Sequence, residues 1–359
     1  MTQDERLISY ALNLSKKNIG QTSSNPTVGC VITKNNTIIS TGITATSGRP
    51  HAETIAINKV SDKSILEGAT LYVTLEPCSH TGVTSPCADA IIKHKFKKVV
   101  IATQDPDFRV NGNGIKKLIA AGIAVVTGIK EKEAQKINRA FFKSRLTGLP
   151  FITLKIATSL DGKIATNNFD SKWITSQKAR NFAHHLRSIN NAILVGANTV
   201  KKDNPTLNCR IPGLEDYSPQ RVIISNSLDF DKQLNIFQDS KTPTIILTNN
   251  DNADLPFAKL IHCSQKNGQI DLIDALKKLQ KHGINSILLE GGQNLATQFL
   301  QENLVDELIW IRNKKIIGND GIPAIGEMGF DSIASVLNNF KKQHVQELDE
   351  DSIEVYEKM

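Results

Sequence analysis

The stretch from residue 51 to residue 87 carries the residue types of a metal site. It opens with "HAE", which contains His51 and Glu53, and it continues to "TLEPCSHTGVTSPC", in which Cys78 and Cys87 each follow a proline. Two thiolates and an imidazole are a ligand set that Zn²⁺ favours, and catalytic zinc keeps three protein ligands with a fourth position open. The pattern therefore predicts a zinc site made by His51, Cys78 and Cys87.

A zinc ion in such a site would serve hydrolysis of an amino group. Zinc makes a bound water acidic enough to be a nucleophile near neutral pH. Glu53 is too close to His51 in sequence to be expected as a further metal ligand. The role that fits it is transfer of a proton from that water to the departing amine. The known deaminase signature is His-x-Glu followed by Pro-Cys-x-x-Cys. Pro77-Cys78 fits it, but eight residues separate the two cysteines instead of two.

Plainer interpretations of these residues stay open. A cysteine is most often a small buried hydrophobe, although the joint pattern of His-x-Glu and Glu-Pro-Cys weighs against coincidence. A purely structural zinc would need a fourth protein ligand, for which His80 is the candidate, and it would leave Glu53 without a task. Asn25, in "NPTVGCVI", has an amide that can bind the edge of a nucleobase-like substrate. Asn-Pro is just as typical of the start of a turn.

Composition and length limit the class of protein. A chain of 359 residues is longer than a domain with a single hydrophobic core usually is, so two domains are expected. Apolar residues make up 40% and charged residues 22%, which is typical of a soluble globular protein. The first residues, "MTQDERLISYALNLSKK", lack the apolar core of a signal peptide, and no stretch is apolar enough to span a membrane. We expect a cytoplasmic protein without a membrane partner.

The cysteines are too few and scattered for a disulfide framework: Cys30, Cys78, Cys87, Cys209 and Cys263.

The net charge of +7 raises the question of a nucleic-acid partner. Lysines and arginines are spread along the chain, mostly as pairs, and aromatic residues make up only 5% of it. Stacking platforms for bases are therefore scarce. We expect no nucleic-acid partner; attraction to phosphorylated small molecules is the second interpretation of the charge.

Both halves of the chain alternate strands with helices. "VGCVITKNNTIISTGIT" predicts two strands joined by a polar turn at residues 34–36. Strand and helix patterns then alternate up to residue 143, which predicts an α/β domain with a mainly parallel sheet covered on both faces. "TGLPF", residues 147–151, breaks the pattern, and "FITLKIATSLDGKIA" starts a second α/β series. The expected domains are residues 1–146 and 147–359.

The second half carries a weaker signal for a dinucleotide. "LLEGGQNLATQFL" is typical of a strand, two glycines and a helix. Such a turn lets the backbone approach a pyrophosphate, and the helix offers free N–H groups. An ordinary strand-to-helix turn has the same pattern. A Gly-x-Gly-x-x-Gly motif is missing from the sequence, so a standard Rossmann domain is disfavoured.

These motifs together resemble a known family. The zinc pattern resembles the cytidine-deaminase superfamily, and "TLEPCSHTGVTSPC" with "QDPDFRVNGNG" is similar to the first half of the bifunctional riboflavin-biosynthesis deaminase–reductases. The resemblance runs from about residue 5 to about residue 345. It implies a cytidine-deaminase-like α/β/α sandwich followed by a dihydrofolate-reductase-like α/β domain. It also implies zinc and NADPH as cofactors, a phosphoribosylated pyrimidine substrate and a homo-oligomer.

The resemblance also assigns residues of the second half. By it, the NADPH site includes Ala157, Trp173, Thr199, Asp203, Gly292, Gln293, Asn294, Leu295, Ala296, Thr297 and Gln298. By it, the substrate site includes Ser171, Arg187, Leu207, Arg210 and Glu290. The guanidinium groups of Arg187 and Arg210 could each donate two hydrogen bonds to a phosphate. Lys155 can add positive charge, and Glu290 or water is the candidate proton source for the reduction.

The chain departs from this family at Val83, where a basic residue is usual, and at Asp107-Phe108, where Asn-Pro is usual. One rival is a nucleoside or nucleic-acid base deaminase with an appended nucleotide-binding domain, which would need an aromatic-bearing basic groove. The other rival is a binding module that has lost its chemistry, against which the intact metal pattern argues.

Overall fold

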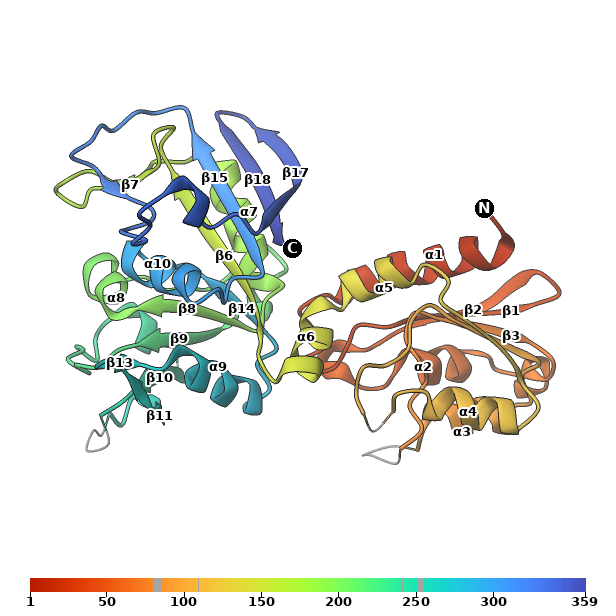
Figure 1. Cartoon of the computed structure of the whole chain (residues 1–359). Coiled ribbons are helices and arrows are strands. Elements are labelled where there is room, and N and C mark those ends of the chain that lie inside the picture. The colour runs from red at the N-terminus through yellow and green to blue at the C-terminus, as the bar shows by residue number, and fades with distance from the viewer. Residues whose placement is uncertain (81–84, 109, 240–241, 251–254) are drawn as a thin grey trace. The chain divides into compact units, whose positions relative to one another are not determined.

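The computed structural model describes residues 1–359 except 81–84, 109, 240–241 and 251–254. The chain divides into two compact units, Met1–Gly148 and Leu149–Met359 (Figure 1). Helix α6 (Arg139–Thr147) continues through the boundary expected at 146/147, and Gly148 ends it with a left-handed φ of 71°. Glycine adopts this conformation at no steric cost, which is why the helix stops there.

The first unit is built on a mixed sheet with the strand order β2-β1-β3-β4-β5. β1 pairs antiparallel with β2 and β3, whereas β3, β4 and β5 are parallel. The turn between β1 and β2 contains Asn35 and Asn36 at φ values of 50° and 63°, which asparagine tolerates well. The hairpin expected at residues 34–36 is thus confirmed. The strands are β1 (Gly29–Lys34), β2 (Thr37–Ile43), β3 (Thr70–Val73), β4 (Lys98–Ile101) and β5 (Ala124–Thr127).

Helices cover both faces of this sheet, as expected for an α/β/α sandwich. Ile8 and Leu12 of α1 and Ala134 of α5 pack on one face. Ala56 of α2 and Ile91 of α3 belong to the core on the other face, together with residues of α4 and α6. Figure 1 shows α1 and α5 on one side of the strands and α2, α3 and α4 on the other. The helices other than α6 are α1 (Gln3–Ser15), α2 (Ala52–Lys59), α3 (Cys87–Lys93), α4 (Asn113–Ala120) and α5 (Glu131–Ile137).

The second unit has a sheet of nine described strands in the order β11-β10-β9-β8-β14-β6-β15-β18-β17. Its strands are parallel from β11 to β15, and the terminal β17–β18 hairpin is antiparallel. The strands of the unit are β6 (Phe151–Thr158), β7 (Lys163–Ala165), β8 (Ala192–Gly196), β9 (Gln220–Ile224), β10 (Thr244–Thr248), β11 (Ala258–His262), β12 (Gln265–Lys266), β13 (Gln269–Ile270), β14 (Ser286–Leu289), β15 (Glu307–Asn313), β16 (Ile322–Pro323), β17 (Phe340–Leu348) and β18 (Asp351–Lys358).

Among the described residues of this unit, four α-helices cover the two faces of the larger sheet. Leu276 of α9 and Phe299 of α10 belong to the core on one face, and Leu186 of α7 and Val200 of α8 to the core on the other. The helices are α7 (Gln177–Ser188), α8 (Ala197–Asp203), α9 (Leu272–Lys281) and α10 (Gln293–Gln301). Across the described residues we find no helix with both the length and the apolar character that a membrane crossing requires.

Candidate functional sites

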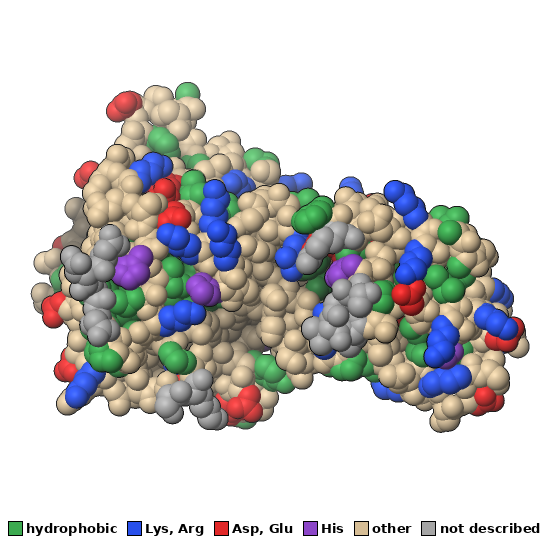
Figure 2. Space-filling model, turned by 90° about the horizontal axis from the view of Figure 1, so that it is seen from below, with side chains coloured by type: hydrophobic (Ala, Val, Ile, Leu, Met, Phe, Trp, Pro, Cys, Tyr) green, Lys and Arg blue, Asp and Glu red, His purple; other side chains and the backbone are tan. Residues whose placement is uncertain are grey.

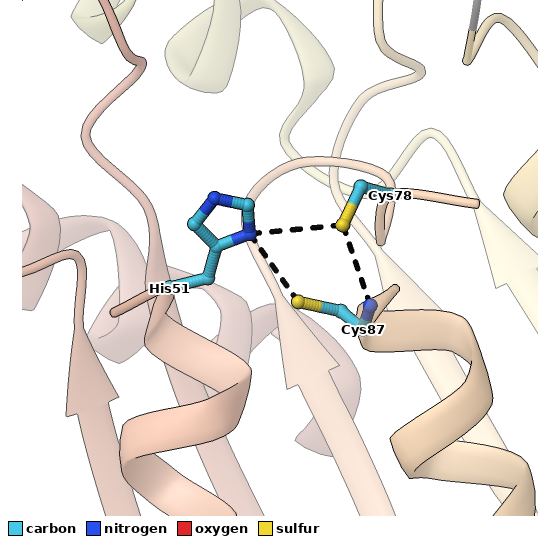
Figure 3. Close-up of side chains that lie close together, drawn as sticks. All are labelled: His51, Cys78 and Cys87. Atoms are coloured by element: carbon cyan, nitrogen blue, oxygen red, sulfur yellow. Dashed lines mark hydrogen bonds between the residues drawn. The ribbon is translucent and has the colours of Figure 1, made fainter. Parts of the chain in front are cut away.

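Three donor atoms from separate parts of the sequence meet in the first unit. His51 is the residue immediately before α2, Cys78 lies in the segment after β3, and Cys87 is the first residue of α3. Figure 3 shows the imidazole of His51 turned toward both sulfur atoms. Two of the donors thus lie at helix starts and the third follows a strand. This arrangement brings together residues that are 27 and 9 positions apart in the sequence.

The spacing of these donors fits a zinc ion. His51 Nδ1 lies 3.3 Å from Cys87 Sγ and 3.7 Å from Cys78 Sγ, and the three donor atoms all lie within 4.8 Å of one another. A tetrahedron with ordinary Zn–S and Zn–N bonds has donor-to-donor edges of about 3.5–3.8 Å. Two thiolates and an imidazole also suit zinc far better than Mg²⁺ or Ca²⁺, which prefer oxygen. The residues present therefore fit the expected metal.

The electrostatics of the cluster favour a thiolate and a protonatable carboxyl. A hydrogen bond with Cys87 is the main reason why the pKa of Cys78 falls to about 4, with a contribution from His51, although burial opposes the fall. Glu53 is buried at 4% exposure in the first turn of α2. Burial raises its pKa to about 7, and the negative charge of Cys78 adds to this rise. Glu53 thus lies where its carboxyl is screened from bulk water.

The alternative with a fourth protein ligand finds no support in the described residues. The potential metal-binding cluster there consists of His51, Cys78 and Cys87 and does not include His80. The His80 Nδ1 atom is buried and has no hydrogen-bond partner among the described residues. Three protein donors leave room for a fourth, non-protein ligand, which is the arrangement of catalytic zinc. Val83 lies outside the described residues.

Asn25 lies close to the loop that leads to His51. Its Nδ2 atom donates to the Gly48 carbonyl oxygen at 3.5 Å, a long bond, and the Asn25 side chain is half-buried. Gly48 has a left-handed φ of 89°, and a Cβ there would stand 2.2 Å from Asn25 Nδ2. The asparagine therefore packs tightly on this turn, and binding of a nucleobase-like substrate by its amide stays a prediction.

The second unit contains a cavity of about 620 Å³ beside α7 and β6. Five of the residues assigned by resemblance line it: Ala157, Ser171, Trp173, Arg187 and Arg210. Arg180 and His184 also line the cavity and were missed by the sequence analysis. Their spacing along α7 was the available signal, because positions 180, 184 and 187 share one face of a helix. Three cationic or imidazole side chains from one helix thus face the same space.

Arg187 is engaged by a carboxylate inside the protein. Its Nε and Nη2 atoms donate to Glu290 at 2.8 and 3.1 Å, and Nη1 donates to the Asn208 carbonyl oxygen at 3.1 Å. Lys155 Nζ lies 3.7 Å from Glu290. Burial alone would raise the pKa of Glu290, but Arg187 and Lys155 outweigh it and hold this pKa at about 2. The two cations thus hold Glu290 as a carboxylate in the protein, and the proton source of the reduction stays a prediction.

The residues assigned to the cofactor fall into two groups. Ala157 and Trp173 line the cavity, whereas Thr199 and Gly292 lie beside each other, since a Cβ on Gly292 would be 3.6 Å from Thr199 Oγ1. Asp203 is the last residue of α8, and burial raises its pKa. Leu207, assigned to the substrate, is buried at 4% exposure with a left-handed φ of 56°.

Polar groups of the 292–298 segment reach the surface at its start and again at Gln298. Gly292 caps α10, Gln293 is half-buried and Asn294 is exposed. Leu295, Ala296 and Thr297 are buried in the core, and Gln298 Nε2 donates to Gln269 Oε1 at 2.7 Å. A ligand can therefore use the free N–H groups at the helix start, as phosphates commonly do.

Comparison with known proteins assigns both units to families. Residues 1–103 match the cytidine and deoxycytidylate deaminase zinc-binding region, and residues 150–353 match the RibD C-terminal domain. The riboflavin biosynthesis protein RibD of Aquifex aeolicus is 40% identical over 356 residues, which cover 98% of this chain and 97% of that protein. The protein of the same name from Escherichia coli is 38% identical over 330 residues, 89% of either chain.

Solved structures agree with this assignment over the whole chain. The deaminase/reductase of Thermotoga maritima is 36% identical with a TM-score of 0.89, and Acinetobacter baumannii RibD is 33% identical with a TM-score of 0.91; each comparison covers 99% of both chains. The family, the order of its two halves and the two-domain α/β fold expected from the sequence are confirmed. The chain therefore belongs to the RibD family of bifunctional riboflavin-biosynthesis enzymes, in which a zinc-dependent deaminase is followed by a reductase.

Proposed function

We propose that this chain performs two successive steps on one phosphoribosylated pyrimidine. The first unit deaminates a diaminohydroxyphosphoribosylaminopyrimidine, and the second reduces the ribosyl side chain of the resulting 5-amino-6-(5-phosphoribosylamino)uracil to ribityl with NADPH. The observation that carries the proposal is the group of three zinc-type donors with Glu53 two residues from His51. The names of the Thermotoga maritima relative's two activities support the substrates.

In the first step we assign His51, Cys78 and Cys87 to the metal and Glu53 to proton transfer. When bound by these three residues, zinc would lower the pKa of a water so that hydroxide forms near neutral pH as the nucleophile for the amino-bearing ring carbon. Glu53 would accept the proton released in this way and donate it to the amino group, which would leave as ammonia. Because Glu53 is buried, the proton stays with the reacting groups instead of exchanging with bulk solvent. Asn25 is assigned to the pyrimidine through its amide.

In the second step we assign the cavity of the second unit to the substrate. The exposed Arg210 is the arginine placed to bind the ribose phosphate, since Arg187 is occupied by Glu290. Ser171 and Leu207 are also assigned to the substrate site. NADPH supplies the hydride when bound, and the free N–H groups at Gly292 and Gln293 hold its pyrophosphate. Thr199, Asp203 and Trp173 border the cofactor, and water supplies the proton.

We assign the deaminase to residues 1–146 and the reductase to residues 147–359. We also propose a cytoplasmic enzyme that works as a homo-oligomer and binds no nucleic acid. The reducing environment of the cytoplasm suits a metal site with two cysteine ligands, and the described cysteines are all unpaired. The RibD C-terminal match over residues 150–353 supports a reductase in place of the nucleotide-binding domain of the rival base deaminase.

A coupled assay tests both steps on the full zinc-loaded chain. The phosphoribosylated diaminopyrimidine is supplied, and ammonia release and NADPH absorbance are followed separately for the parent, Glu53→Gln and Glu67→Gln. We expect ammonia before NADPH consumption in the parent, and neither in Glu53→Gln. Glu67→Gln is the matched control, because Glu67 is an exposed carboxylate paired with Lys95. A parent that binds zinc but releases no ammonia would contradict the proposed deamination.

A further inference from the structure

A second buried glutamate lies near the metal site and plays no part in the proposed chemistry. Glu76 is two residues before Cys78 and is 3% exposed. Its Oε2 atom accepts hydrogen bonds from the backbone N–H groups of Asp105 at 3.2 Å and Gly112 at 2.9 Å. Its Oε1 atom accepts from Gly114 at 2.9 Å and Ile115 at 3.2 Å. One carboxylate thus satisfies four main-chain donors from another part of the chain.

These donors belong to the segment that follows β4 and enters α4. Residues 102–112, of which the structure describes all but 109, connect the two elements, and the part after Thr103 is called segment 104–112. Gly114 and Ile115 lie in the first turn of α4, where N–H groups have no partner within the helix. The side chain of Glu76 therefore replaces a local cap, and its negative charge suits the positive end of the helix.

Backbone contacts also join the residues before Cys78 to the residues on either side of segment 104–112. The N–H group of Glu76 donates to the Thr103 carbonyl oxygen at 3.0 Å, and that of Ala102 donates to Val73 at 3.0 Å. Gly114 lies so close to the chain that a Cβ there would stand 2.1 Å from the Pro77 carbonyl oxygen. The residues before Cys78 are therefore joined to residues 102–103 and packed against the first turn of α4, without space for a side chain at Gly114.

The location of segment 104–112 gives it a role in binding. β3 and β4 are parallel neighbours, so Cys78 and segment 104–112 both follow the carboxyl ends of strands at one edge of the sheet. Ligands of open α/β sheets bind at this edge. Asp105 and Val110 of the segment are buried, whereas Gln104 and Phe108 are exposed, Phe108 at 85%. The buried side anchors the segment and the exposed side is available to a ligand.

We propose that Glu76 is a positioning residue for deamination: its carboxylate holds residues 104–108 and 110–112 against the residues before Cys78, so that these described residues form one wall of the pyrimidine pocket beside the metal. The inference rests on the proposed deaminase function. Glu76 acts through the segment and does not bind the metal.

Cys78 itself has contacts that do not depend on the Glu76 side chain. Its sulfur accepts the N–H group of Cys87 at 3.3 Å, and its carbonyl oxygen accepts that of Ala88 at 3.1 Å. Removal of the Glu76 charge should therefore release segment 104–112 while the three metal donors stay together. The expected signature is weaker substrate binding with an unchanged metal site.

The test compares Glu76→Gln with Glu67→Gln in the full zinc-loaded chain. Glutamine keeps the shape of the side chain but presents an N–H₂ group to two of the four main-chain donors. We expect the KM of ammonia release to rise by about tenfold or more, because a pocket wall that is no longer held in place positions the substrate less well. The kcat, the zinc content and the absorption spectrum of the cobalt(II)-substituted protein should stay as in the parent. Glu76→Asp, which keeps both oxygens, should recover part of the KM.

Two results would overturn the inference. An unchanged KM in Glu76→Gln would show that the segment needs no such anchor. Loss of zinc or an altered cobalt spectrum would show that Glu76 acts on the metal ligands instead. Reductase activity of the same variants, assayed with the deaminated substrate, reports on the fold of the rest of the chain. If the parent releases no ammonia, the proposed function fails and not this inference.

A measurement on the parent covers the case in which Glu76→Gln does not fold. Amide hydrogen exchange reads the four main-chain donors directly. The N–H groups of Asp105, Gly112, Gly114 and Ile115 should exchange slowly, as core amides do. Addition of the deaminase substrate should slow exchange in segment 104–112 further. Fast exchange at these four amides, or no response to substrate, would overturn the inference without any variant.

Discussion

Arg187 and Glu290 form a buried ion pair with two nearly equal hydrogen bonds, 2.8 Å from Nε to Oε1 and 3.1 Å from Nη2 to Oε2. Their side chains are 13% and 12% exposed, and Lys155 approaches the same carboxylate at 3.7 Å. One carboxylate thus neutralises two cations at the edge of the cavity in the second unit. Arg187 shapes the cavity through this pair, and Arg180 and Arg210 line the same cavity.

Replacement of Glu290 by glutamine should destabilise the second unit. Arg187 and Lys155 would remain buried without a counter-charge, which typically costs about 3–5 kcal/mol. Both tryptophans, Trp173 and Trp310, belong to this unit, so denaturant unfolding followed by tryptophan fluorescence measures it selectively. Glu350→Gln, which removes an exposed carboxylate paired with Lys314, should change the free energy of unfolding by less than about 1 kcal/mol. Equal effects of the two variants would contradict this prediction.

The buried Asp105 should make the first unit less stable as the pH rises. Burial raises its pKa to about 7 in the folded protein, from an ordinary value of 3.8. The folded state then binds a proton that the unfolded state has lost, so the stability decreases from about pH 4 to about pH 7 and is constant above. Asp105→Asn should have no such loss and should be about 1–3 kcal/mol more stable than the parent at pH 8.

Calorimetric unfolding of the zinc-loaded protein at several pH values measures this difference. The control is Asp89→Asn, which removes an exposed carboxylate paired with Lys117 and should show no comparable dependence. An advantage of Asp105→Asn that is the same at pH 4 and at pH 8 would show that ionisation of Asp105 is not its cause.

Gly114→Ala should weaken zinc binding, in contrast to the variants of Glu76. The new methyl group would displace the Pro77 carbonyl oxygen, which lies one residue before Cys78. We expect faster zinc release to a chelator, by about tenfold. Gly122→Ala is the matched control: it has a left-handed φ of 81° but no atom within 4 Å of a Cβ, so it should cost about 1 kcal/mol of stability and leave zinc release unchanged. Equal release rates in the two variants would refute the steric explanation.

Cys87→Ser should remove the metal from the first unit while the second keeps its activity. A serine oxygen is a poor substitute for a thiolate, so the variant should bind well under one zinc per chain and should release no ammonia. Reduction of the deaminated substrate by NADPH should continue, because the two units have separate cores. Metal analysis with both half-reactions checks this. Cys263→Ser, a buried cysteine of the second unit, should keep its zinc.

The grouping of His51, Cys78 and Cys87 and the family could be predicted from the sequence alone, because both depend on residue type and local spacing. His51 and Cys87 stand at helix starts, and Cys78 follows a strand, so a few residues around each decide where it points. The alternation of strands and helices likewise predicts two α/β units, because each element is selected by the periodicity of its own residues.

Only the tertiary structure decided which charged groups meet one another. Glu76 and Ile115 are 39 residues apart, and Arg187 and Glu290 are 103 apart. A buried carboxylate can bind a helix start, a guanidinium or a substrate. Which of these it meets depends on the order of the strands and on the face of the sheet where it lies, and no local sequence pattern encodes either. The sequence therefore determined the chemistry that the protein can perform, and the packing of distant segments determined which residues remain available to perform it.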